Sequence, residues 1–256
     1  MQLIAYMLCV LGYVAYGMMR GGDYARLLAE VTILGQTSQT NIMLAISAVS
    51  AILSFIWCGV LYIKSSWRSE HVDYGQVFSI KNVLCILCIG SGCCILLTFL
   101  LSLLTAVFPQ AFQNYTKLMS NFESGNMILT LGYAVLIGPV SEEMIFRGAI
   151  FDRVYTVFPF WKANIIQAVL FGVYHMNIVQ GLYAFCLGMV LGIIVKATGS
   201  ILCSMITHIT FNGTSYLLPV ILGTGAAWVN IIVLIIALFL IAAGIFGIKF
   251  LMRSLN

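Results

Sequence analysis

The stretch NVLCILCIGSGCCILLTFLLSLLTAVF, residues 82–108, contains no charged side chain and is long enough to cross a lipid bilayer as a single helix. The chain around it has the same character, because 62% of its 256 residues are hydrophobic and only 8% are charged. A soluble domain of this size would carry more charge to keep its surface solvated. The sequence therefore predicts an integral membrane protein.

Hydropathy divides the chain into eight predicted helices. They are expected at about 1–19, 42–63, 82–108, 127–156, 162–180, 181–197, 200–218 and 227–250, with polar loops near 20–41, 64–81 and 109–126. The first is expected to be a retained span, because it lacks the basic start of a signal peptide. The predicted fold class is all-α: a polytopic transmembrane helical bundle of about eight helices, in a single membrane-embedded domain over residues 1–256.

Lysine and arginine are distributed unequally between the two ends of these helices. With a cytoplasmic N-terminus, eight lie on the inner side, Lys64, Arg68, Lys81, Arg153, Lys162, Lys196, Lys249 and Arg253, and three on the outer side, Arg20, Arg26 and Lys117. Since cytoplasmic loops carry the excess of basic residues, we expect both termini to be cytoplasmic. No basic cluster with interleaved aromatic residues occurs, so no nucleic-acid partner is expected.

Six polar side chains stand inside the predicted spans, in the stretches EEMIFRG (142–148), FGVYH (171–175) and HITFN (208–212). They are Glu142, Glu143, Arg147, His175, His208 and Asn212. Ionisable groups are expensive to place in hydrocarbon, so residues of this kind mark a functional site. Their grouping indicates hydrolytic chemistry within the membrane.

The first stretch separates two adjacent acids. Glu143 and Arg147 are four residues apart, so they lie one turn apart on the same helix face and can form an ion pair. Glu142 is rotated by about 100° from Glu143 and can face a cavity. Two acids in different environments can serve as a structural carboxylate and a general base. The alternative is that this stretch is simply a charged helix end at the membrane interface.

Pro139, three residues before Glu142, has two readings. Inside a helix it would remove a hydrogen bond and displace the carbonyl of Val135, which fits a kink beside a water-containing pocket. It could equally open a new helix at its first turn.

The other two stretches supply nitrogen groups. The Phe171 ring is expected to pack over His175, and His208 and Asn212 are expected on one helix face. A carboxylate that takes a proton and nitrogen donors that face a developing negative charge suit hydrolysis by direct attack of water. Glu142, His175 and His208 could also form a zinc set of two histidines and a glutamate, although the spacing is not HExxH. Zinc is therefore an open alternative, and no cofactor is certain from the sequence.

Ala184, Gly188 and Gly192 repeat at four-residue spacing along the helix predicted at 181–197. Small residues in such a strip let two helix backbones approach closely in lipid. The strip is expected to serve packing, without a chemical role.

The ordered trio EExxxR, FxxxH and HxxxN resembles the CAAX-protease and bacteriocin-processing family of intramembrane proteases, which includes the Ras-converting prenyl-protein protease. The resemblance covers about residues 127–218, the expected catalytic core. It implies that Glu142 is the general base that activates water and that His175 holds this water. It also implies that His208 and Asn212 stabilise the oxyanion, with Glu143 and Arg147 as a supporting pair. Both metal-dependent and glutamate-only mechanisms have been argued for this family.

The leading hypothesis is an intramembrane endopeptidase in a multi-pass membrane location. Its substrate would be a prenylated CAAX-type C-terminus, a leader peptide or a short membrane peptide. The alternatives are a non-proteolytic membrane protein of the same fold, acting as a bacteriocin-immunity or scaffold factor, and a proton-coupled transporter, against which no inverted repeat is evident. The compact loops favour a bacterial plasma membrane; a eukaryotic host would indicate the endoplasmic reticulum.

Overall fold

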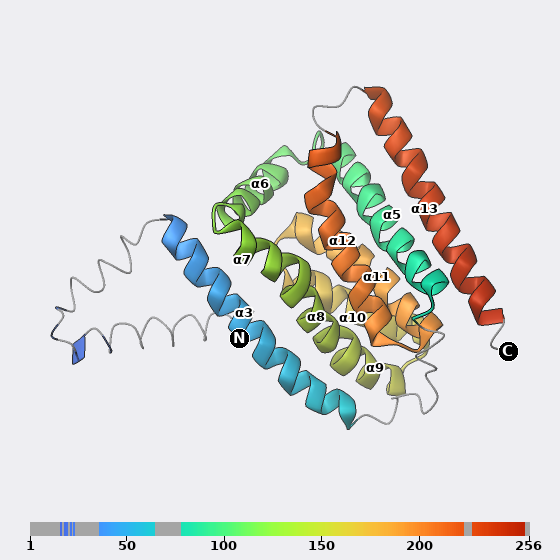
Figure 1. The fold of residues 1–256 in the computed structure, drawn as a ribbon, viewed down its shortest axis with the longest axis horizontal. Helices are drawn as coiled ribbons and strands as arrows, with labels where there is room; N and C mark the ends of the chain where they lie inside the picture. Colours follow the sequence, from blue (N-terminus) through green and yellow to red (C-terminus); the bar gives the residue numbers. More distant parts are fainter. Residues whose placement is uncertain are drawn as a thin grey trace.

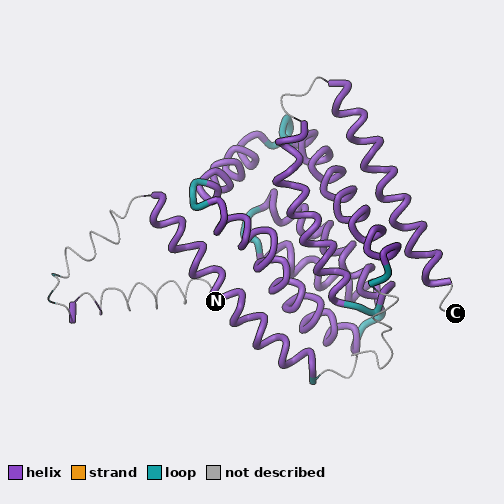
Figure 2. Tube along the Cα trace, viewed as in Figure 1, coloured by secondary structure: helices purple, strands orange, loops and turns teal. Residues whose placement is uncertain are grey.

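The computed structural model describes residues 36–64, 78–222 and 227–253, together with residues 16, 18, 19, 21 and 23. Within this part of the chain every regular element is helical, so the predicted all-α fold is confirmed (Figures 1 and 2). The predicted first span, 1–19, lies almost entirely outside the described residues, as do Arg20, Arg26 and Arg68.

Among the residues that the structure describes, four helices are long and apolar enough to cross a membrane, which confirms a multi-pass membrane protein. They are α3 (Gln36–Ile63), α5 (Ile80–Leu104), the continuous helix Met127–Val157 and α11 (Ile178–Thr198). Two further long helices, α12 (Ile201–Leu222) and α13 (Ala227–Arg253), lie alongside α5 (Figure 1).

Glycine brings α5 close to both of these neighbours. A Cβ atom at Gly90 would lie 2.8 Å from the Thr207 carbonyl oxygen of α12, and one at Gly92 would lie 2.9 Å from the Ala237 carbonyl oxygen of α13. Small residues at helix crossings let backbones approach where lipid offers no hydrophobic driving force. The position of α5 between α12 and α13 therefore depends on these two glycines (Figure 1).

The polar loop expected at 109–126 is mostly a helix, α6 (Pro109–Glu123), so this prediction was wrong. Pro109 suits the first turn of a helix, where its missing N–H has no partner to lose. Phe112, Tyr115, Met119 and Phe122 follow a helical spacing and are half-buried, whereas the residues between them are mostly exposed. Averaged hydropathy hides such a helix, because its polar and apolar faces cancel.

The boundary predicted at 180/181 was also misplaced. The turn lies at residues 175–177, where α10 (Phe160–Tyr174) ends after 15 residues and α11 begins. Asn177 starts α11, because its side-chain oxygen accepts hydrogen bonds from the N–H groups of Val179 and Gln180, each at 3.0 Å. The apolar composition continues through the turn, which explains why hydropathy missed it.

The helix Met127–Val157 contains two π-helical segments. It runs through α7 (Met127–Leu131), η1 (Gly132–Ile137), α8 (Gly138–Glu143), η2 (Met144–Phe151) and α9 (Asp152–Val157). A π-helical segment changes the direction of the side chains that follow it and is frequent at functional sites. The two acids predicted to act therefore lie on a short α-helical piece between two π-helical segments.

The helices alternate in direction, so basic residues gather at one end of the bundle. Lys64 directly follows α3, Lys81 lies in the first turn of α5, and Lys162 lies in the first turn of α10. Lys196, in the last turn of α11, donates a hydrogen bond of 2.8 Å to the Tyr155 hydroxyl of α9. That this end faces the cytoplasm stays a prediction from the charge distribution.

Candidate active site

Pro139 determines which carbonyl group lacks a backbone donor in the helix Met127–Val157, the central helix of the site. Just before Pro139, the helix is wound as a π-helix, and the Gly138 N–H donates to the carbonyl of Tyr133, five residues earlier. Pro139 has no N–H, so the carbonyl five residues before it, that of Ala134, loses its helical donor. The Asn212 side-chain nitrogen donates to this oxygen at 2.8 Å. Pro139 thus lies in the first turn of α8 within a continuous helix, and the Ala134 carbonyl accepts from a side chain of another helix in place of a helical donor.

Glu143 is the centre of a buried ion-pair network. Its Oε1 atom lies 2.8 Å from Arg147 Nη1 and 2.9 Å from His208 Nδ1, so one carboxylate oxygen accepts from both groups. The Glu143 and Arg147 side chains are 0% exposed. The expected pairing of Glu143 with Arg147 is present, and it also fixes the imidazole of a residue 65 positions away.

Glu142 has a different environment from Glu143. Its side chain is 14% exposed, and its Oε2 atom lies 3.7 Å from His208 Nε2. This distance is too long for a hydrogen bond, but both atoms face the same space. The imidazole of His208 therefore has one carboxylate bound at Nδ1 and a second one opposite Nε2.

Phe171 forms a platform for the site. Its ring centroid lies 5.0 Å from that of His175 and 5.6 Å from that of His208, and both ring pairs are T-shaped. The Arg147 guanidinium carbon lies 4.6 Å from the Phe171 ring centroid. The Phe171 side chain is 1% exposed, so the ring is held by its neighbours. Phe171 packs against His175 as expected, and it also links His175 to the cluster around Glu143.

The end of α10 fixes the tautomer of His175. The backbone N–H of His175 donates to Gly172, so the Phe171 carbonyl is free of its usual helical donor. His175 Nδ1 lies 2.9 Å from that carbonyl oxygen. A carbonyl only accepts, so Nδ1 carries the hydrogen, and the neutral form of the ring then has its lone pair on Nε2.

The zinc set considered from the sequence does not fit this geometry. Among the described residues, no three His, Cys, Asp or Glu side chains are gathered closely enough to hold a metal ion. Glu142, His175 and His208 as they stand are therefore not a zinc ligand set.

Two buried residues outside the three motifs belong to the same region. Asn164 and Gln167, both on α10, are 0% exposed, and Gln167 Nε2 bonds the Gly188 carbonyl oxygen, as does Arg147 Nη2. The sequence interpretation did not include them. A signal was present, because Asn164, Gln167, Phe171 and His175 follow each other at helical spacing and share one face of α10.

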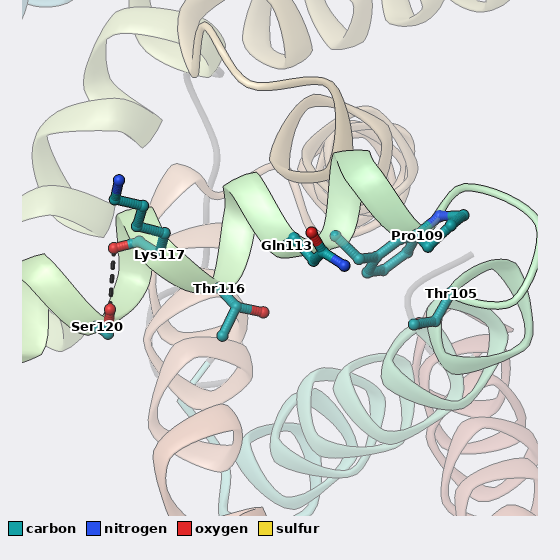
Figure 3. Close-up of a pocket in the computed structure, with 7 residues that line it drawn as sticks. Thr105, Pro109, Gln113, Thr116, Lys117 and Ser120 are labelled. Atoms are coloured by element: carbon teal, nitrogen blue, oxygen red, sulfur yellow. Dashed lines mark hydrogen bonds between the residues drawn. The ribbon is translucent and has the colours of Figure 1, made fainter.

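Two pockets lie outside this cluster. One, of about 470 Å³, is on α6 and is lined by residues such as Gln113, Thr116 and Lys117 (Figure 3). The other, of about 250 Å³, lies between α3 and the central helix and has an almost wholly apolar lining. It reaches Ser141, the residue before Glu142.

Comparison with known proteins finds a match to one protein family. Residues 124–214 match the family described as type II CAAX prenyl endopeptidase Rce1-like. The resemblance to this family is confirmed. The matched segment runs from just before α7 to beyond Asn212 and contains all three motifs.

A curated relative comes from Bacillus subtilis (strain 168) and is named "Putative membrane peptidase YdiL". It is 28% identical over 189 residues, which cover 70% of this chain and 74% of the relative. No solved structure matches the chain. The roles of the individual site residues stay predictions.

Proposed function

We propose that the protein is an intramembrane endopeptidase that hydrolyses a peptide bond by water activated at Glu142. The observation that carries this proposal is the placement of His208 between two carboxylates. Glu143 binds Nδ1 at 2.9 Å, while Glu142 Oε2 lies 3.7 Å from Nε2. A water molecule or a carbonyl oxygen beside Nε2 can therefore contact both the imidazole and a partly exposed carboxylate.

The proposed mechanism uses a protonated His208, which would balance the charges of the cluster. Glu142 and Glu143 are two carboxylates, and Arg147 is one cation. An uncompensated charge in a medium of low dielectric constant is costly, so the cluster is most stable when its charges sum to zero. A protonated His208 gives that sum, with its Nδ1–H donating to Glu143 and its Nε2–H free for a developing oxyanion.

The reaction then follows from the groups present. Glu142 takes a proton from water, and the hydroxide attacks the carbonyl carbon of the substrate. The oxyanion accepts hydrogen bonds from His208 Nε2–H and from the second hydrogen of the Asn212 amide, whose first hydrogen is bound to Ala134. Glu142 returns the proton to the leaving nitrogen as the C–N bond breaks. The lone pair of His175 Nε2 accepts a hydrogen bond from the other O–H of this water and so orients the water.

The proposed substrate is a membrane-associated peptide, either a prenylated C-terminus or a leader-type segment. The family description and the membrane peptidase relative support a peptide substrate. The apolar pocket reaches Ser141, the residue before the proposed base in the chain, and suits a hydrocarbon group. A peptide whose apolar part enters this pocket would bring a peptide bond close to Glu142.

The test uses purified full-length protein in liposomes, a library of prenylated and leader-type peptides, and mass spectrometry of the products. We expect cleavage by the wild type and none by Glu142→Gln or His208→Ala. Cleavage by both variants would refute the assigned mechanism. A biological function, such as immunity, that survives Glu142→Ala would favour the non-proteolytic alternative. Loss of cleavage with a chelator, reversed by added zinc, would show that a metal ion activates the water.

A further inference from the structure

Two fully buried amide side chains on α10, those of Asn164 and Gln167, have no part in the mechanism proposed above. An amide inside a membrane bundle is costly unless it is hydrogen-bonded. The contacts of these two side chains therefore indicate why they are present.

The contacts lead from α10 to the ion-pair network. Asn164 Nδ2 donates to the Met189 carbonyl oxygen at 3.0 Å, and its Oδ1 accepts from Gln167 Nε2 at 2.7 Å. Gln167 Nε2 also donates to the Gly188 carbonyl oxygen at 2.9 Å. Arg147 Nη2 donates to the same oxygen at 3.2 Å. One backbone carbonyl thus joins the two amides to the guanidinium that holds Glu143.

The small residues of α11 make room for these contacts. A Cβ atom at Gly192 would overlap the Asn164 amide oxygen, and one at Gly188 would lie 3.3 Å from Arg147 Nη2. The same Gly188 Cβ would lie 3.1 Å from Ala168, so the strip also provides the close helix packing expected from the sequence. It was expected to have no chemical role, but it also accommodates the polar network.

We propose that Gln167 and Asn164 are positioning residues for the active site. Gln167 contacts the Gly188 carbonyl from α10 and sets where Arg147 can meet that oxygen. Arg147 Nη1 then holds Glu143 Oε1, which holds His208 Nδ1. The orientation of the His208 imidazole therefore depends on the Gln167 amide, although none of these hydrogen bonds joins Gln167 directly to Glu143 or His208. This inference rests on the proposed function for its catalytic meaning.

The simpler explanation is that both amides only tie α10 to α11. In that case their loss would reduce stability and would affect turnover only through the fraction of folded protein. Gln167→Met is the test variant, because methionine has nearly the same shape and no donor. Val195→Ala is the control, since Val195 is buried on α11 in an apolar cluster with Phe151 and Ala163 that contains none of the hydrogen-bonded residues of the network.

In the activity arm, kcat and KM are measured for the folded fraction of each variant. We expect Gln167→Met to lower kcat by about tenfold to a hundredfold with KM changed less than about twofold, because a small misplacement of a catalytic group acts on the transition state. We expect Val195→Ala to keep the wild-type kcat. Equal kcat values for the two variants would overturn the proposal.

In the second arm no substrate is needed. The melting temperatures of Gln167→Met, Arg147→Lys and the double variant form a cycle. Lysine keeps the charge opposite Glu143 but loses the planar fork that also reaches Gly188, so this variant is expected to fold. We expect the double variant to lose clearly less than the sum of the two single losses.

Additive losses would show that Gln167 does not act through Arg147 and would overturn the proposal. If the wild type cleaves no peptide, the proposed proteolysis is wrong. The melting-temperature cycle still shows in that case whether Gln167 is coupled to Arg147. The two failures are therefore distinguishable.

Discussion

Glu143 and His208 are joined by a 2.9 Å hydrogen bond between Oε1 and Nδ1, although they lie on different helices. This bond gives the two adjacent acids different environments. Glu143 is bound on the inside of the bundle, whereas Glu142 is partly exposed and has no bond to the imidazole. The two acids should therefore respond differently to the same substitution.

Glu142→Gln should abolish cleavage and leave the melting temperature close to that of the wild type, because it removes a partly exposed charge. Glu143→Gln should lose both activity and stability, since it breaks a buried ion pair, and such a loss costs about 3–5 kcal/mol. Thermal unfolding in detergent, measured beside peptide cleavage, checks the contrast. Equal melting temperatures for the two variants would contradict the structural role of Glu143.

Asn212→Ala should destabilise the protein by about 1–3 kcal/mol, because the Ala134 carbonyl would lose its donor inside the membrane. The same substitution should cost less in a Pro139→Ala background, where the N–H of residue 139 can bond that carbonyl. Unfolding free energies of the two single variants and the double variant test this. Full additivity would show that Pro139 does not release the Ala134 carbonyl.

Phe171→Leu should reduce turnover at nearly unchanged KM, because the aromatic ring packs against His175, His208 and Arg147 at once. The matched control is Phe151→Leu, since Phe151 is equally buried but packs against Tyr155 and Phe160. Both variants should lose stability, by less than the about 3–5 kcal/mol of a Phe→Ala change in a core. A similar loss of kcat in both would refute the platform role.

Met176→Gly should stabilise the protein by roughly 1 kcal/mol. Met176 has a φ of 53°, a left-handed conformation that glycine adopts without strain, and its side chain is 90% exposed. The change of unfolding free energy measures the effect. A destabilised variant would show that the methionine side chain makes contacts that outweigh the strain of its backbone.

The sequence predicted well what depends on local spacing. Long apolar runs gave most of the helices, and the four-residue spacing of Glu143 and Arg147 gave their ion pair. Features that depend on tertiary contact were missed. The bond from His208 to Glu143 joins residues 65 positions apart, and no pattern along the chain specifies such a register.

Two other misses have separate causes. Helix α6 has a polar and an apolar face, so its average hydropathy resembles that of a loop. Gln167 and Asn164 looked like ordinary polar residues near the start of a span, and their role depends on the position of the Gly188 carbonyl. That position follows from the approach of α10 to α11, which sequence alone does not give.

Helix α10 makes the proposed reaction sensitive to bilayer thickness. From the exposed Lys162 to His175 the helix rises about 20 Å, which is less than the about 30 Å of a typical hydrocarbon layer. The His175 imidazole is therefore nearer to the membrane surface opposite the start of α10, and water reaches it by the shorter path from that surface. Lipids with longer acyl chains would lengthen that path and slow hydrolysis, whatever peptide is offered.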